Sequence, residues 1–363
     1  MSAAVPAVRR AERRPDAESG PAVPAELVNK VVVAIDVGGT TIKGALVDSL
    51  GREALTAVEP TPTGRSGRDA IGVAVDVAER LTRAAGTAGV AATGVVVPGP
   101  VDAGSGTALY SANLGWRDLA VRTTFRRRLT APIVVDNDVL AAALAETTVG
   151  AARGVDDALV VVIGTGIAGA AVSGGYLVRG AANGAGEIGH VVVDRSGSVC
   201  SCGKAGCLET VASARGIARR YAERRVAGGH PASSAPPLDA AAIVAVTDTD
   251  PVAAQVWDDA ITALARVLAT YVLVVEPTVV VVGGGLSLAG TRLTAPLERA
   301  LASELGWRPS PRIAVSALAP RGGIAGAAVL AWRRAGLPNF SGWGPRGGAQ
   351  ATEGSGRGVP SRA

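Results

Sequence analysis

The sequence contains few cysteines, histidines and aromatic residues, and it has no long apolar run. Of its 363 residues, three are cysteine, two are histidine and 3% are aromatic. Typical apolar stretches, at 31–35, 158–163 and 278–282, are far shorter than the ~20 residues of a membrane-spanning helix. The N-terminal segment carries two arginine pairs but no apolar core of signal-peptide length. These absences predict a globular cytoplasmic protein without a membrane span.

Disulfides and nucleic-acid binding are both disfavoured by the composition. Three closely spaced cysteines cannot form a paired disulfide framework, and in a reducing compartment such a group favours metal binding. The net charge is +5, part of it in arginine-bearing ends, which gives only weak support for a nucleic-acid partner. No such partner is expected.

The common nucleotide-binding motifs are missing as well. No G-x-x-x-x-G-K-[ST] occurs, and no G-x-G-x-x-G lies between a strand and a helix with a suitable acidic residue beyond it. Neither a P-loop nor a Rossmann site is therefore expected.

The apolar content, 48%, is sufficient for two domains, and a repeated pattern suggests how they are built. The segment 31–59 shows a strand, a Gly-Gly-Thr turn, a returning strand and a third strand, and 157–180 repeats this order around Gly-Thr-Gly. Further patterns predict helices near 67–86, 139–149, 208–226, 251–274 and 322–335, and strands at 94–97, 133–135 and 278–282. This alternation predicts an α/β protein of two related lobes.

We assign the lobes and ends by composition and pattern. Residues 30–134 with 321–336 form a small lobe, and residues 135–320 form a large lobe that includes a zinc loop at 190–207. The segments 1–29 and 337–363 are rich in Gly, Pro, Ser, Ala and Arg and are predicted to be a disordered arm and tail.

Glycine-rich turns after strands are candidate phosphate sites. In the first, Asp36-Val37-Gly38-Gly39-Thr40, glycines allow close approach of a polyphosphate and the carboxylate can orient hydrated Mg²⁺. A tight hairpin turn explains the same residues equally well. The related turn 164–166 favours the phosphate interpretation, and a third turn, 283–285, suits a nucleoside or a plain strand-to-helix connection.

Three consecutive polar residues, Asp136, Asn137 and Asp138, separate a strand from a helix. One of them is expected to cap the helix. A cap needs only one residue, so Asp138 is a candidate general base for a hydroxyl that attacks phosphorus, and Asn137 can bind a neighbouring hydroxyl.

The cysteine loop, 199–209, follows a Glu187-Ile188-Gly189-His190 segment. Three cysteines and His190 make a Cys₃His set, although three buried thiols are the alternative. Four protein ligands leave no open position, so the expected zinc is structural. It would hold Glu187, His190 and Glu209 around one pocket as hydroxyl binders.

Residues 31–335 resemble the ROK family of repressors, open reading frames and sugar kinases. Eight motifs carry the resemblance in the family's order: D-x-G-G-T at 36–40, P-G-P-V-D at 98–102, S-A-N-L-G-W at 111–116, N-D at 137–138, G-T-G at 164–166, G-E-I-G-H at 186–190, C-x-C-G-x-x-G-C-x-E at 200–209 and G-G-G at 283–285. The resemblance implies a two-lobed actin-like, hexokinase-like fold of the ribonuclease H-like type. Its lobes would close over ATP-Mg²⁺ and a sugar in the cleft between them.

The resemblance also implies roles for single residues. Asp138 is the catalytic base; the sugar-binding residues, besides Asp138, are Gly99, Asn113, Asn137, Glu187, His190 and Glu209. The nucleotide and magnesium side comprises Asp36, Gly38, Gly39, Thr40, Lys43, Thr165, Gly166, Gly284 and Gly285, and the zinc ligands are His190, Cys200, Cys202 and Cys207. Gly99 and Asn113 follow from the resemblance alone.

The expected activity is ATP-dependent phosphorylation of a sugar, most simply glucose to glucose 6-phosphate. Val139-Leu140 replaces the family's usual Ala-Asn and Ala168 stands where Gly is frequent, which leaves another hexose, an N-acetylhexosamine or a C7 cyclitol open. A non-catalytic sugar sensor is the alternative of another class, and polyphosphate is an alternative donor. Fewer than 30 residues precede the first strand, which disfavours a helix-turn-helix repressor. A homodimer or homotetramer is expected, as is common in the family.

Overall fold

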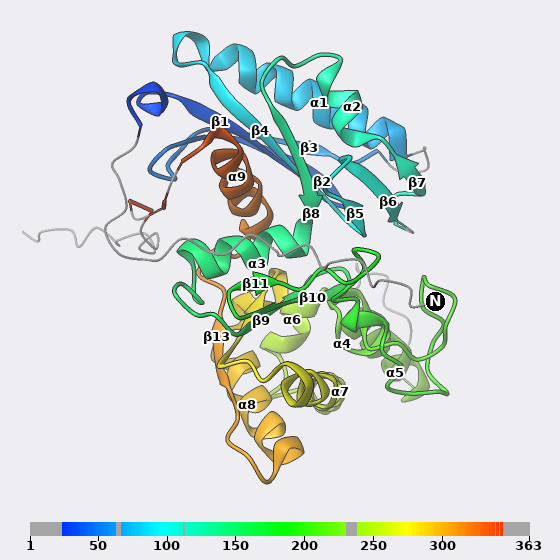
Figure 1. The fold of residues 1–363 in the computed structure, drawn as a ribbon. Helices are drawn as coiled ribbons and strands as arrows, with labels where there is room; N and C mark the ends of the chain where they lie inside the picture. The colour runs from blue at the N-terminus through cyan, green and yellow to red at the C-terminus, as the bar shows by residue number, and fades with distance from the viewer. Residues whose placement is uncertain are drawn as a thin grey trace, which may run out of the picture.

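The computed structural model describes residues 24–62, 67–111, 113–229, 238–337, 339–340 and 342–343 (Figure 1). Most of the predicted disordered arm and tail, 1–23 and 344–363, lies outside the described residues. Within the described ranges no helix is both long enough and apolar enough to cross a membrane.

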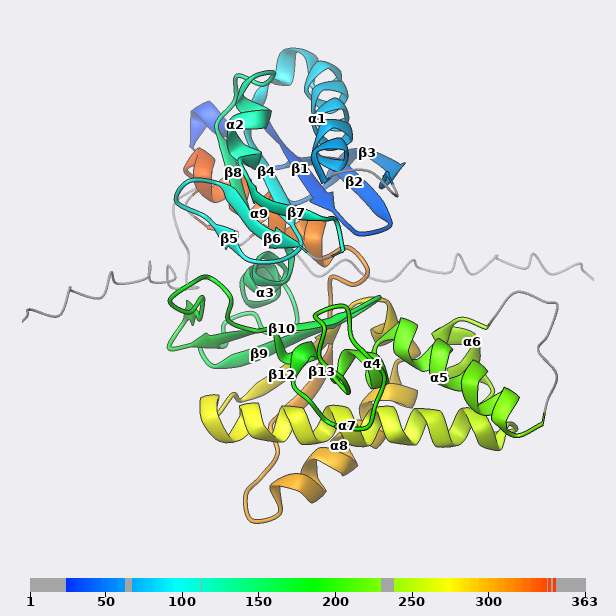
Figure 2. The same ribbon diagram turned by 90° about the vertical axis from the view of Figure 1, so that its right-hand side faces the viewer.

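Two five-stranded sheets have the same strand order and the same pattern of directions (Figures 1 and 2). The first is ordered β3 (Glu53–Pro60), β2 (Thr41–Asp48), β1 (Val31–Val37), β4 (Val90–Val97), β8 (Ile133–Asn137); the second is ordered β11 (Tyr176–Leu177), β10 (Ile167–Ser173), β9 (Ala158–Ile163), β12 (Val279–Gly283), β13 (Arg312–Val315). In each sheet the central strand pairs antiparallel with its hairpin partner and parallel with the later strand. The repeated unit and the α/β class predicted from the sequence are confirmed.

The first sheet has a helical layer on each face because alternate residues of its strands point to opposite sides. Val33 and Ile35 of β1 face a core shared with α1 (Gly67–Ala84) and α2 (Val121–Arg126), whereas Val32 and Ala34 face α9 (Gly322–Ala335). A small sheet of β5 (Val101–Asp102), β6 (Thr107–Ser111) and β7 (Trp116–Leu119) adjoins α2. Two 3₁₀ turns, Ala25–Leu27 and Gly86–Ala88, complete this lobe.

In the second lobe one face of the sheet is covered by a helical layer. It consists of α4 (Glu209–Ala212), α5 (Ala214–Ala227), α6 (Ala240–Ala245), α7 (Pro251–Val275) and α8 (Thr291–Leu305), with 3₁₀ turns at Ile188–His190 and Gly285–Ala289. The single helix predicted over 208–226 is wrong: the chain is extended at Ser213, whose side chain accepts from Gly216 N and starts a new helix.

Helix α3 (Asp138–Val149) lies between the two sheets (Figure 2). Its sequence, DVLAAALAETTV, is apolar around almost the whole circumference, which is the pattern of a helix buried on all sides. Ala141 and Leu144 pack in the core of the first lobe, and Leu140 and Ala143 pack in that of the second. The residue that begins this helix, Asp138, is thereby placed at the junction of the lobes.

Two predicted boundaries need correction. The lobe boundary at 134/135 divides β8, because Val135, Asp136 and Asn137 continue the pairing with β4. The tail predicted from residue 337 begins too early. Leu337, Phe340 and Trp343 are buried against the first lobe, where their apolar side chains lose contact with water.

Candidate active site and metal centre

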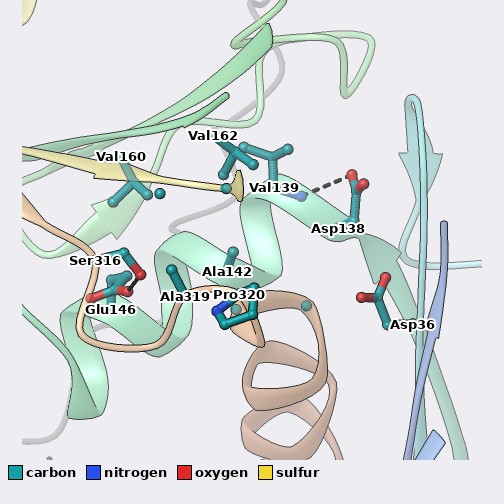
Figure 3. Close-up of a pocket in the computed structure, with 14 residues that line it drawn as sticks. Asp36, Asp138, Val139, Ala142, Glu146, Val160, Val162, Ser316, Ala319 and Pro320 are labelled. Carbon is teal, nitrogen blue, oxygen red and sulfur yellow. Dashed lines mark hydrogen bonds between the residues drawn. The ribbon is translucent and has the colours of Figure 1, made fainter. Parts of the chain in front are cut away.

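A cavity of about 140 Å³ lies between the lobes (Figure 3). It is lined by Asp36 at the end of β1, Asp138 at the start of α3 and Gly284 after β12, three of the residues predicted for the site. The other lining residues are Val139, Ala142, Glu146, Val160, Val162, Gly283, Ser316, Ala319, Pro320, Gly322 and Gly323. The structure therefore brings the Asp36 carboxylate of the first lobe and the Asp138 carboxylate at the lobe junction to the glycine turn of the second lobe.

The surroundings of Asp138 shift its protonation equilibrium toward neutral pH. Burial raises the pKa of Asp138 to about 7, and the charges of Asp36 and Glu187 act in the same direction. The N–H of Val139, 2.9 Å from Asp138 Oδ1, opposes them. Burial also raises the pKa of Asp36, against the attraction of Lys43, which is half-buried.

Asn137 caps α3, which confirms the alternative considered for this position. Its Oδ1 accepts from Val139 N and Leu140 N, both at 2.9 Å, and its Nδ2 donates to Gly99 O at 3.0 Å. An amide nitrogen carries two hydrogens, so the second can still meet a hydroxyl.

Gly99 and Asn113 were expected from the resemblance alone. Gly99 has φ 86°, and a Cβ there would lie 2.0 Å from Tyr110 O, so the position requires glycine. Asn113 is exposed in the turn between β6 and β7.

The second and third glycine turns lie side by side because β9 and β12 are neighbouring parallel strands, with Val162 opposite Gly283. Gly284 has φ 81°, and a Cβ there would lie 2.4 Å from Ile163 O. Thr165 and Gly285 are exposed at this edge. The first turn is closed by a bond from Gly38 N to Thr41 O at 2.9 Å, and leaves Gly39 and Thr40 exposed. Gly38, Gly39, Thr40, Thr165 and Gly166 are not among the residues that line the cavity.

Three predicted hydroxyl binders form a chain of contacts in the second lobe. His190 Nε2 lies 3.7 Å from Glu187 Oε2, and His190 Nδ1 lies 3.5 Å from Cys200 Sγ. The buried Glu209 carboxylate accepts from Ser201 Oγ at 3.2 Å and is so close to Gly166 that a Cβ there would lie 2.6 Å away. Glu209 therefore packs against the second glycine turn.

The cysteines and His190 have the arrangement of a metal centre. One donor atom each of His190, Cys200, Cys202 and Cys207 lies within 4.8 Å of all the others, and Cys202 Sγ is 3.6 Å from Cys207 Sγ. Such spacings fit a tetrahedral ion bound at about 2.0 to 2.3 Å. Burial and the neighbouring thiols raise the pKa of Cys207 to about 12, a repulsion that a divalent cation would relieve.

Several residues near the site were missed from the sequence. Glu146, two turns after Asp138 on α3, is buried and accepts from Ala151 N at 2.7 Å and from Ser316 Oγ. Gly323 lies against Asp36, where a Cβ would be 2.5 Å from Oδ2. The Gly322-Gly323 pair at the start of a predicted helix was the available signal for this close approach.

Comparisons with known proteins agree with this architecture. A glucokinase of Halalkalibacterium halodurans is 33% identical over 280 residues, 74% of this chain and 84% of that protein. An N-acetylmannosamine kinase of Escherichia fergusonii is 33% identical over 274 residues, 75% of this chain and 88% of that protein. A crystal structure of a ROK family glucokinase from Streptomyces griseus, in complex with glucose and AMPPNP, superposes with a TM-score of 0.73 and 31% identity, covering 84% of this chain and 99% of that one.

These likenesses establish the fold as the two-lobed actin-like, hexokinase-like type. The sequence model of the ROK family matches residues 32–334, almost all of the described chain. The chain therefore belongs to the ROK family.

Proposed function

We propose that this ROK family sugar kinase transfers the γ-phosphoryl group of ATP to the 6-hydroxyl of glucose. The observation that carries the proposal is the Asp138 carboxyl, which faces the interlobe cavity beside Asp36 with its pKa raised to about 7. A base with a pKa near the working pH is suited to take a proton from an attacking hydroxyl. The likeness to glucokinases supports glucose as the acceptor.

In the proposed reaction the sugar 6-oxygen attacks the γ-phosphorus. The new O–P bond forms as the bond from phosphorus to the bridging oxygen of ADP breaks, and the hydroxyl proton passes to Asp138. Glu187, His190 and Glu209 would hold the ring hydroxyls, with the second Nδ2 hydrogen of Asn137. Most of the rate then comes from alignment of the two substrates.

The nucleotide would be bound by the glycine turns. Gly39, Thr165 and Gly285 are exposed, and the backbone N–H groups of their turns can face phosphate oxygens. Asp36 lines the first-lobe end of the cavity and would orient hydrated Mg²⁺. Lys43, opposite Asp36 on β2, would neutralise a phosphate oxygen. When bound, Mg²⁺ neutralises the charge that develops on the β- and γ-oxygens.

We further propose a structural zinc at His190, Cys200, Cys202 and Cys207. The donor set and its spacing support a closed tetrahedral site. His190 would bind zinc through Nδ1, which lies toward Cys200, and keep Nε2 toward Glu187 and the sugar. Zinc would thus fix the orientation of a sugar-binding imidazole and take no part in bond breaking.

The test is an ADP-release assay with ATP-Mg²⁺ over hexoses, N-acetylhexosamines and C7 cyclitols. Glucose should be the best acceptor, and Asp138→Asn should lower kcat by about 10²- to 10⁴-fold because it removes the general base. Asp258→Asn, on the exposed surface of α7, is the control and should match wild type. A loss of only a few-fold in Asp138→Asn would show that Asp138 is not the base.

An N-acetylhexosamine or a cyclitol is the second candidate acceptor, and two observations bear on it. Val139, which lines the cavity, stands where ROK kinases usually have Ala, and the likeness to an N-acetylmannosamine kinase is as high as that to a glucokinase. Preferred turnover of an N-acetylhexosamine or a cyclitol would replace glucose while leaving the mechanism intact. Sugar binding by calorimetry without turnover would instead identify a sensor.

The assembly is proposed to be a homodimer or homotetramer. Light scattering on the purified protein would give the mass in solution, for comparison with 36.0 kDa per chain.

A further inference from the structure

Asp136 and Arg179 form an ion pair that joins the two lobes. Asp136 lies on β8 of the first sheet and is 2% exposed, and Arg179 follows β11 of the second sheet. Arg179 Nη1 donates to Asp136 Oδ1 at 2.8 Å and Nη2 donates to Oδ2 at 2.7 Å. The Asn137 N–H also donates to Asp136 Oδ1, at 2.8 Å. The pair is bidentate and buried on the carboxylate side, unlike the exposed ion pairs of this chain.

The backbone of Arg179 is held at the other side of the site. Its carbonyl accepts from Ala185 N at 3.2 Å, which closes the loop 180–184. The next residues are also fixed: Gly186 O accepts from Gly169 N at 2.7 Å, and a Cβ on Gly186 would lie 1.9 Å from Gly169 O. Glu187 follows directly.

Arg179 therefore contacts two short segments at once. Its guanidinium contacts Asp136, two residues before Asp138, and its carbonyl contacts Ala185, two residues before Glu187. Only two residues separate Asp136 from Asp138 and Ala185 from Glu187, so a shift of the ion pair would move both carboxylates.

We propose that Arg179 is a positioning residue, which through Asp136 fixes the loop carrying Glu187 relative to Asp138. The inference rests on the proposed function for the roles of Asp138 and Glu187. It assigns to Arg179 the task of keeping the group that holds the acceptor in register with the group that deprotonates it.

Arginine suits this task for two reasons. Its planar guanidinium matches both carboxylate oxygens at once and so fixes orientation as well as distance, which the single ammonium of lysine cannot do. Its charge also compensates Asp136, which would otherwise place a third buried negative charge near Asp36 and Asp138.

The experiment compares Arg179→Met and Arg179→Lys with wild type, using whichever sugar wild type phosphorylates. Arg179→Met should lower kcat by about 10²-fold, since misplacement by about 1 Å costs that much, and should raise the sugar KM. The KM for ATP should stay within about twofold. Arg179→Lys, which keeps the charge but not the bidentate geometry, should recover part of kcat. Arg128→Met, which breaks an exposed pairing with Asp76 and Glu79, is the matched control.

A second readout does not depend on the substrate. Hydrogen exchange in Arg179→Met should speed up both in 180–187 and in 135–138, and Asp136→Asn should do the same. The double variant Asp136→Asn/Arg179→Met should exchange hydrogen no faster than Arg179→Met, because both substitutions break the same ion pair. The inference is overturned if hydrogen exchange in both segments is unchanged in Arg179→Met, or if the KM for the sugar and the KM for ATP rise by the same factor. Wild-type silence across the sugar panel would instead refute the proposed function, with the exchange result still deciding the role of Arg179.

Discussion

At the residue scale, the Asp138 carboxyl combines a chemical use with an energetic cost. Burial and the charges of Asp36 and Glu187 raise the pKa of Asp138, and the hydrogen bond from Val139 N lowers it, which leaves the pKa at about 7. The same surroundings that make it a base disfavour its ionisation in the folded chain. Activity and stability should therefore both depend on pH through this one group.

The activity should rise with pH through neutrality. With a pKa of about 7, Asp138 is mostly protonated at pH 6 and mostly ionised at pH 8, and only the ionised form can accept the proton. We expect kcat/KM for the sugar to fall about tenfold for each pH unit below 7, at saturating ATP-Mg²⁺. A flat profile between pH 5.5 and 8 would contradict the assignment.

Stability should show the opposite trend. The pKa of Asp138 is about 7 in the folded protein and about 4 in an unfolded chain, so folding favours the protonated form. The stability associated with this group is complete below pH 4 and is lost as the pH rises toward 7. Asp138→Asn should therefore melt a few degrees above wild type at pH 8, with a smaller gain at pH 5. An equal difference at both pH values would show that the effect is not electrostatic.

At the element scale, helices α3 and α9 cross at unusually close range. A Cβ placed on Gly326 would lie 2.4 Å from the backbone carbon of Ala141, and one on Gly94 would lie 2.0 Å from Ala327 O. Small residues along α9 thus let it approach both the interlobe helix and the first sheet. The position of Asp138, at the start of α3, depends on this contact.

Gly326→Ala should weaken the fold. The added methyl must push the two backbones apart, and overpacking of this kind costs about 1–3 kcal/mol. Gly72→Ala is the matched control, since a Cβ at this helical position of α1 meets nothing within 4 Å. It should raise stability by about 0.5–1 kcal/mol, because alanine favours a helix over glycine. Denaturant unfolding of both variants would decide; changes of the same sign would refute the packing argument.

The cysteine loop is the second element whose geometry should govern the site. Protein purified without added metal should contain about one zinc per chain. Cys202→Ser should lower the zinc content and raise the sugar KM more than the ATP KM, because His190 would lose its fixed orientation. Ser201→Ala, beside it but outside the donor set, should keep the zinc. Absence of zinc from active wild-type protein would remove the metal from the proposal.

At the scale of the whole molecule, the sequence predicted the repeated unit because its evidence is local. A strand, a glycine turn and a returning strand can be recognised within about 25 residues, and 31–59 and 157–180 both show them. The helix predicted near 139–149 is observed at Asp138–Val149, where Asn137 caps it. Asp36 and Asp138, 102 positions apart, could be assigned to one site only through the family resemblance, and the cavity now joins them.

The contacts that the sequence did not predict are those between distant segments with no motif. Arg179 has an ordinary neighbourhood in sequence, and its pairing with Asp136 depends on how the two sheets face each other. A charged residue near the end of a helix, such as Glu146, is expected to be exposed, yet its side chain is buried and contacts Ser316. Trp343 lies in a stretch whose Gly and Pro content predicts disorder. Composition does not show that this one aromatic side chain is buried against the first lobe.

Trp343 should anchor the chain end to the first lobe and contribute strongly to stability. Its ring lies edge-on to Phe340 at 5.1 Å and against Gly51, and its Nε1 donates to Ser49 O at 2.9 Å. Arg153, just after α3, donates to its carbonyl at 3.3 Å. Trp343→Ala should cost about 3 kcal/mol in thermal or denaturant unfolding, the lower end for a buried tryptophan, because this one is near the chain end. Trp307→Ala, at a tryptophan that is 83% exposed, should leave stability unchanged. Trp343 does not line the cavity, so kcat at low temperature should match wild type in both variants. A loss of kcat in Trp343→Ala would mean that this anchor also controls how the two lobes contact each other at Asp138.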